Sequence, residues 1–112
     1  MRDNVKGGAL TETTLFILLA LYKPNHGYGI MQFIELKTSG RLSLGAGTLY
    51  GAINTLLKKE WIEPYESKDD SRKKEYLITS KGKIVVENEI ARLNDVLNIS
   101  LKIVGDDKIW KK

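Results

Sequence analysis

The stretch Leu42-Ser-Leu-Gly-Ala-Gly-Thr-Leu-Tyr-Gly-Ala-Ile-Asn-Thr-Leu-Leu-Lys-Lys-Glu-Trp61 decides the fold of this chain. Its apolar residues recur at the i, i+4, i+7 and i+8 positions of one helix face, which comprises Leu49, Ile53, Leu56 and Leu57. The opposite face carries small and polar side chains without an acid, namely Thr48, Gly51, Asn54, Thr55 and Lys58. Hydroxyl, amide and ammonium groups suit the base edges and phosphates of DNA. This pattern predicts a recognition helix, with an ordinary solvated amphipathic helix as the alternative.

The composition fits one small domain with an anionic partner. The chain has 112 residues, a net charge of +4 and a pI of about 9.3. Because it has no cysteine, disulfides and thiolate zinc sites are excluded. The longest apolar run, Leu15–Tyr22, is too short to span a bilayer, and the first residues lack the pattern of a signal peptide. We therefore expect a cytoplasmic protein that does not associate with a membrane.

Two helices are expected before the recognition helix. Residues 1–8 read as a mobile arm, and Thr11 caps a first helix that runs to Tyr22 and is apolar on nearly every side. After a break at residues 23–27, a second helix spans Tyr28 to Lys37, and an extended piece, Arg41–Leu44, leads to the recognition helix. The stripe of the second helix comprises Ile30, Phe33 and Ile34. This order is the helix-turn-helix plan.

The residues after the recognition helix predict a β-hairpin. Residues 61–67 and 74–79 are rich in β-branched and aromatic side chains, and they flank the charged segment 68–73. Pro64 has no amide proton, so its strand belongs at an edge of the sheet. The expected fold is mainly α, a winged helix-turn-helix with a two-stranded wing.

The last predicted helix begins at Thr79 or Ser80 and ends at Gly105. Apolar residues follow an almost heptad spacing along it, at Val86, Ile90, Leu93, Leu97, Leu101 and Val104. Beside them lies a second strip of Val96, Ile99 and Ile103. One small domain cannot cover both strips, so this helix should pack on the first helix and on its counterpart in a second chain. We expect a DNA-binding domain with a short arm over residues 1–79, and a dimerisation helix and tail over residues 80–112.

The chain resembles the PadR-like transcriptional regulators, in particular the short subgroup with one C-terminal helix. The shared motifs are Leu19-Ala20-Leu21, His26-Gly27-Tyr28-Gly29-Ile30, Leu42-Ser43-Leu44, Gly47-Thr48-Leu49-Tyr50, Leu56 to Ile62, and Arg72-Lys73 with Tyr76-Leu77-Ile78-Thr79 and Gly82. The resemblance implies a dimeric winged-helix repressor that binds a two-fold operator and is released by a small molecule or cellular signal. Two features depart from the family: Asp70-Ser71 stands where a wing-tip glycine is usual, and residues 80–104 lack the tryptophan against which some short members bind drugs.

The proposed DNA contacts come from the recognition helix and the wing. Thr48, Asn54 and Tyr50 are candidates for bases or phosphates, although Tyr50 lies at the edge of the apolar arc, where burial and contact are equally open. The candidates for the backbone are Lys58, Arg72, Lys73 and Lys74. Tyr28 could touch a phosphate, but core packing is the favoured interpretation.

Other chemistry finds little support in the sequence. The expected dimer contacts are Ile90, Leu93, Leu97, Leu101 and Val104, and an effector site is conceivable beside Leu15, Phe16, Leu93 and Leu97, with ordinary core as the stronger interpretation. The single histidine, His26, sits beside a turn glycine and is expected to be structural, so we predict no catalytic site, metal site or cofactor. The alternative function is a winged-helix module that binds protein without binding DNA.

Overall fold

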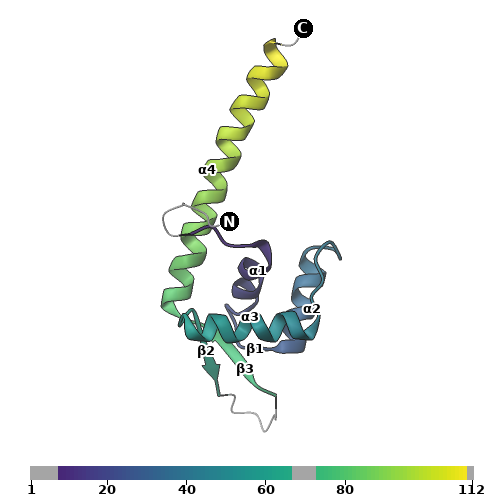
Figure 1. Cartoon of the computed structure of the whole chain (residues 1–112), viewed down its shortest axis with the longest axis vertical. Helices are drawn as coiled ribbons and strands as arrows, with labels where there is room; N and C mark the ends of the chain where they lie inside the picture. The colour runs from purple at the N-terminus through teal and green to yellow at the C-terminus, as the bar shows by residue number, and fades with distance from the viewer. Residues whose placement is uncertain (1–7, 67–72, 111–112) are drawn as a thin grey trace.

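The computed structural model describes residues 8–66 and 73–110 of the chain. These residues form, in order, α1 (Glu12–Ala20), β1 (Asn25–His26), α2 (Gly27–Lys37), α3 (Ala46–Lys58), β2 (Ile62–Tyr65), β3 (Glu75–Ile78) and α4 (Ser80–Trp110). Figure 1 shows α1, α2, α3 and the sheet gathered into one body, from which the second half of α4 extends alone. None of the helices in the described ranges is long and apolar enough to cross a membrane.

The predicted apolar stripes form the core. Leu49, Ile53 and Leu56 of α3 are buried, as the spacing predicted, and Leu57 is half-buried. They pack with buried residues of the neighbouring elements, which are Ile17, Leu18, Leu21, Ile30, Ile34, Ile62, Ile78 and Val86. Thr11 caps α1 as expected, because its hydroxyl accepts the Thr14 amide at 3.1 Å. Burial of these stripes turns the polar face of α3 outward, where a ligand can reach it.

The sheet contains one strand more than the predicted wing. Its order is β1-β3-β2, with Asn25 opposite Tyr76 on one side of β3 and Ile62 opposite Ile78 on the other. β1 has two residues, too few for an alternating pattern, so its pairing depends on tertiary contacts that the sequence does not display. Pro64 lies on β2, an edge strand, as predicted.

The connection from α2 to α3 differs from the expectation. Arg41–Leu44 is not a strand, because the chain first reverses at Ser39 and Gly40, whose φ angles are 53° and 80°. The buried Thr38 stabilises this reversal: its hydroxyl donates to the Ile34 carbonyl at 2.8 Å and accepts the Leu42 amide at 3.1 Å. Polar side-chain bonds of this kind fix a turn that apolar spacing cannot reveal.

The prediction that Gly105 ends the last helix is wrong. α4 continues to Trp110, and Gly105 is not among the glycines with positive φ. A glycine inside a helix costs only about 1 kcal/mol relative to alanine, and no proline follows it to break the hydrogen bonding. The helix therefore runs straight through the position that was expected to stop it.

The start of α4 is fixed against the end of α3. The Thr79 hydroxyl donates to the Glu60 carbonyl at 2.7 Å and accepts the Gly82 amide at 3.0 Å. A Cβ atom on Gly82 would overlap the Trp61 carbonyl, so only glycine fits there without a shift. These contacts set the direction in which α4 leaves the body.

A buried carboxylate fastens the N-terminal segment to α4. The Glu89 side chain is 3% exposed, and its two oxygens accept Arg92 Nε at 2.8 Å and Nη2 at 2.6 Å. The hydrogen bonds from Arg92 lower the pKa of Glu89, burial opposes them, and the Leu10 amide lowers it further. Glu89 is thus held ionised inside the fold.

We expect Glu89→Gln to lower the free energy of unfolding by about 1–3 kcal/mol near neutral pH, because a buried charged hydrogen-bond partner is lost. The folded-state pKa lies below the unfolded value of about 4.3. The contribution of Glu89 is therefore complete above that value and is lost as the pH falls through the folded pKa. Urea unfolding between about pH 7 and pH 3 should show the difference between the two proteins shrinking toward acid. A difference that stays constant over this range would contradict the assignment.

Candidate nucleic-acid interface

The polar face of α3 is open to solvent. Thr48, Gly51, Asn54, Thr55 and Lys58 are all exposed, and the helix from Ala46 to Lys58 contains no acidic residue. Apart from the adjoining residues and the backbone of α3 itself, no heavy atom lies within 4 Å of a Cβ placed on Gly51. Because glycine has no side chain, the middle of this face is low. A low, acid-free helix face is suited to lie in the major groove.

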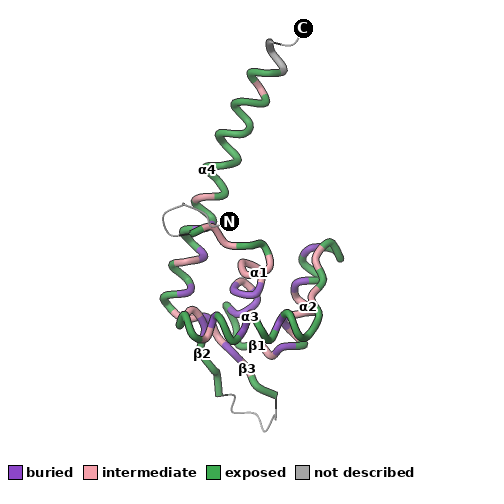
Figure 2. Tube along the Cα trace, viewed as in Figure 1, coloured by how far each residue is buried: buried purple, intermediate pink, exposed green. Residues whose placement is uncertain are grey.

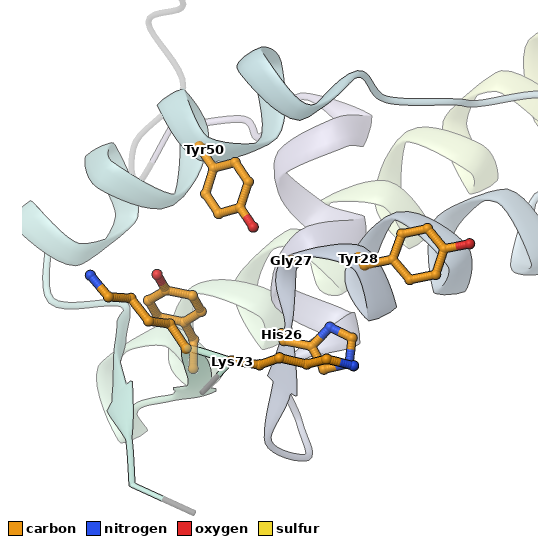
Figure 3. Close-up of a pocket in the computed structure, with 7 residues that line it drawn as sticks. His26, Gly27, Tyr28, Tyr50 and Lys73 are labelled. Atoms are coloured by element: carbon orange, nitrogen blue, oxygen red, sulfur yellow. The ribbon is translucent and has the colours of Figure 1, made fainter. Parts of the chain in front are cut away.

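A hollow opens where α2, α3 and the wing meet. It has a volume of about 270 Å³ and is lined by His26, Gly27, Tyr28, Tyr50, Lys73, Lys74 and Tyr76 (Figure 3). Two ammonium groups and three phenol rings at one opening offer both charge and hydrogen-bond donors. Such a set of groups can hold a phosphate.

Tyr50 joins α3 to the start of α2. Figure 3 shows its hydroxyl directed from α3 toward Gly27, and a Cβ on Gly27 would overlap that hydroxyl. The side chain remains 45% exposed, so it both packs against α2 and can reach a ligand. Tyr50 is therefore not buried, and its contact with DNA stays a prediction.

Two lysines just before β3, Lys73 and Lys74, line this hollow and also a second, neighbouring depression. Lys73 and Lys74 also line a depression of about 450 Å³ together with Asn54 of α3. Its other lining residues are Leu57, Pro64, Tyr65, Glu66, Glu75 and Tyr76. Tyr28, Tyr50, Asn54, Lys73 and Lys74 therefore form one continuous surface, called the reading surface below.

The remaining predicted contacts lie beside the reading surface. Thr48 and Lys58 are exposed on α3 but line neither hollow. Arg72 and the Asp70-Ser71 wing tip lie outside the described residues. Core packing was the favoured interpretation of Tyr28, and it is wrong: the side chain is 62% exposed, and its ring points away from Tyr50 in Figure 3.

Sequence reasoning missed some residues of this surface and interpreted His26 correctly. The ring nitrogen Nδ1 of His26 accepts the Gly29 amide at 3.1 Å, which caps α2 and confirms the structural role.

Tyr76 lines both hollows although it is 8% exposed, a position that only the register of β3 reveals. Glu66 and Glu75 place carboxylates in the second hollow, so the strongest positive charge lies toward the first.

An ion pair ties the connection before α3 to α1. Arg41, in that connection, donates to Glu12 at the start of α1, with one contact at 2.9 Å. The hydrogen bond from Arg41 lowers the pKa of Glu12.

In the described ranges no three histidine, aspartate or glutamate side chains gather as a metal site.

The residues suggested for an effector are not all brought together within one chain. Phe16 lines a groove of about 550 Å³ between α1, α2 and α4, called the helix groove below. Its other lining residues are Leu19, Tyr22, Phe33, Lys37, Val86 and Ile90. Leu15, Leu93 and Leu97 are not part of that lining.

Comparison with known proteins agrees with this architecture. Residues 15–88 match the model of the "Transcriptional regulator PadR-like family". Over 107 residues the chain is 31% identical to "Uncharacterized protein X" of Lysinibacillus sphaericus, covering 91% of this chain and 96% of that protein.

Two solved structures share the fold. A transcriptional regulator from Clostridium thermocellum is 25% identical with a TM-score of 0.68, covering 83% of this chain and 92% of the other. A PadR family transcription regulator from Clostridium difficile R20291 is 22% identical with a TM-score of 0.70, covering 84% and 99%. The family match over residues 15–88 and the winged-helix architecture show that this chain belongs to the PadR-like family of DNA-binding transcriptional regulators.

Proposed function

We propose that the protein acts as a homodimeric repressor, that it binds a DNA operator of two-fold symmetry, and that a small molecule or cellular signal releases it. The observation that carries the proposal is the reading surface, on which the start of α2, the recognition helix α3 and the wing together present Tyr28, Tyr50, Asn54, Lys73 and Lys74. In this arrangement the N-terminal half of α3 enters the major groove, with Thr48 and Asn54 toward the bases. Lys58, Lys73 and Lys74 contact the phosphates on either side, with Arg72 as a further candidate.

Dimerisation is supported by the uncovered apolar face of α4. Ile90, Leu93, Leu97, Leu101 and Val104 are each between 42% and 58% exposed. Figure 2 shows the second half of α4 coloured mostly as exposed. A soluble protein rarely leaves so long a contiguous apolar strip open to water. Pairing of two such helices covers the strips and presents two reading surfaces to one duplex, with residues 1–79 as the DNA-binding part and residues 80–112 as the dimerisation part.

Release would follow from a change in the angle between the two α4 helices. Leu15 and Phe16 of α1 and Leu93 and Leu97 of α4 are the side chains that we propose for an effector site at the dimer crossing. A ligand that binds better to one arrangement of the dimer than to the other shifts the population toward it. Separation of the two reading surfaces from their half-sites would then free the operator.

The proposal predicts a strong dependence on salt that originates in the wing. Each phosphate contact contributes about 0.9 to the slope of log affinity against log salt concentration. We expect Lys73→Ala with Lys74→Ala to lower that slope by up to about 3.6, because a dimer loses four contacts. Fluorescence anisotropy on duplex DNA from upstream of the gene, over a series of salt concentrations, measures the slope.

Lys102→Ala is the matched control, since it removes a lysine from the protruding part of α4. Its slope should equal that of the unmodified protein. An unchanged slope in the double variant would reject the wing contacts, and the absence of any sequence-selective complex would favour the protein-binding module instead.

A further inference from the structure

Gly51 is an exposed glycine in the middle of α3. Inside a helix, glycine is less favourable than any other residue except proline. The fold does not explain its presence, because a Cβ placed there would lie more than 4 Å from every described residue outside α3. Its φ angle is not positive either, so its backbone conformation is open to any residue. Close approach of the helix backbone to a ligand is the remaining use of a glycine at this position.

Three polar side chains surround the low point at Gly51. Thr48, Asn54 and Thr55 lie three or four residues away along α3, which makes them its neighbours on the helix surface, and all three are exposed. Asn54 also lines the depression next to the wing, whereas Thr55 lines a different depression beside the segment that precedes α1. Gly51 thus lies between these two sides, at the centre of the polar face.

The backbone groups of Gly51 are already hydrogen-bonded. In an α-helix its amide donates to the carbonyl four residues before it, and its carbonyl accepts the amide of Thr55. The Thr55 hydroxyl donates to the same carbonyl at 3.2 Å, so both lone pairs of this oxygen are engaged. Gly51 has no side chain and no free polar group, and it therefore offers a ligand only apolar contact.

An apolar low point on a recognition helix favours one group among those on the edges of the base pairs. In the major groove all four bases present hydrogen-bond donors or acceptors, and thymine alone also presents an apolar group, its C5-methyl. A donor or acceptor pressed against Gly51 would lose its water without gaining a partner, which is unfavourable. A methyl group has no hydrogen bond to lose there, and its removal from water is favourable. Thymine is thus the base whose edge fits Gly51.

We propose that Gly51 is a specificity-determining residue, which contacts the C5-methyl group of one thymine in each operator half-site. This inference rests on the proposed function and adds to it a base and the residue that selects this base. Thr48 and Asn54 remain available for hydrogen bonds to the adjoining base pairs. None of the residues that line the helix groove belongs to α3, so a change at Gly51 leaves those side chains as they are.

Gly51→Ala is expected to change stability and DNA binding in opposite directions. The Tm should rise by about 3–8 °C, because a helical glycine is replaced without a clash. The affinity for duplex DNA from upstream of the gene should fall by about 10-fold or more, since the new methyl group occupies the space of the thymine methyl. Gly105→Ala is the matched control: it replaces an uncrowded helical glycine in α4 and should leave the affinity unchanged.

Replacement of thymine by uracil tests the contact from the side of the DNA, because it removes only the C5-methyl group and keeps every hydrogen-bonding atom. Uracil is placed at one thymine at a time across the region that the protein protects from nuclease, and fluorescence anisotropy measures the affinity. For the unmodified protein, one thymine in each half-site should respond with a loss of roughly 4-fold, from the lost burial of its methyl. For Gly51→Ala, uracil at the same thymine should raise the affinity, because the alanine methyl then fills the space.

The two arms separate the possible failures. An unchanged affinity of Gly51→Ala, a fall in its Tm, or a scan in which no thymine depends on residue 51 would each overturn the inference. The scan of the unmodified protein requires no variant, so it decides the thymine contact whatever the behaviour of Gly51→Ala. A sequence-selective complex that is indifferent to uracil rejects only the thymine contact, whereas the absence of any selective complex rejects the proposed function itself.

Discussion

Replacing Leu93 and Leu97 by aspartate is expected to abolish the dimer and to weaken operator binding by about 100-fold or more. Both side chains lie on the exposed strip of α4, 42% and 54% open in the single chain. In the paired helices two carboxylates would face apolar neighbours and lose their hydration, which costs several kcal/mol. A lone subunit reads one half-site and loses the gain of roughly 10²–10⁴ that linked binding provides. Sedimentation velocity and anisotropy on one duplex measure both effects.

Asn94→Asp with Asn98→Asp is the control for added charge. It introduces two carboxylates on the same stretch of α4, at exposed positions outside the strip. Dimerisation should persist in this variant, with a modest loss of DNA affinity from the lower net charge. If both double variants behaved alike, charge rather than strip burial would be responsible, and the role assigned to the strip would be wrong.

Gly82→Ala is expected to have the largest effect on stability, lowering the free energy of unfolding by about 2–3 kcal/mol. The new methyl group would overlap the Trp61 carbonyl, a backbone atom that cannot move aside as a flexible side chain could. The first turn of α4 must then shift away from the end of α3. Thermal unfolding should show a fall in Tm of roughly 4–8 °C for each kcal/mol lost.

Gly105→Ala, in the same helix, is expected to change the stability in the opposite direction. Apart from the adjoining residues and the backbone of α4 itself, no heavy atom lies within 4 Å of a Cβ on Gly105, and the residue is helical. The substitution should therefore raise the helicity of the end of α4 and stabilise it by about 0.5–1 kcal/mol. Destabilisation by Gly105→Ala would show that this position is crowded, and an unchanged Tm for Gly82→Ala would show that Gly82 does not contact the Trp61 carbonyl; either result would contradict the structure.

The parts of the fold that were predictable are those in which apolar spacing or the chemistry of a single residue decides the structure. The stripe of Leu49, Ile53 and Leu56 required α3 to bury one face, and this fixed the exposed polar face at the same time. The edge position of Pro64 followed from its missing amide proton. The cap formed by Thr11 followed from its hydroxyl. In each case a local property of the residue determines its place.

The features that sequence reasoning missed depend on contacts between distant segments. β1 is a strand only because Asn25 and His26 pair with β3. The turn before α3 depends on the buried hydroxyl of Thr38, and the exposure of Tyr28 depends on how the start of α2 lies beside the wing. Gly105 resembles a helix stop in sequence, yet the helical hydrogen bonding on both sides outweighs its weak propensity. Local patterns carry no information about such contacts.

The sequence predicts which residues belong to the candidate site better than it predicts how they lie relative to one another. Asn54, Lys73 and Lys74 were expected to touch DNA, and the structure brings them together around a single depression. Tyr76 joins them through the register of β3, which no helical or alternating pattern specifies. The close approach of Tyr50 to Gly27 likewise requires α2 and α3 to be placed in space before it can be recognised.

Sedimentation velocity of the unmodified chain with a labelled duplex from upstream of its gene tests the central claim most directly. We expect a dimer of the free protein at micromolar concentration, and a complex of two chains per duplex that dissociates as salt is raised. A single subunit under all conditions, with and without the duplex, would contradict it.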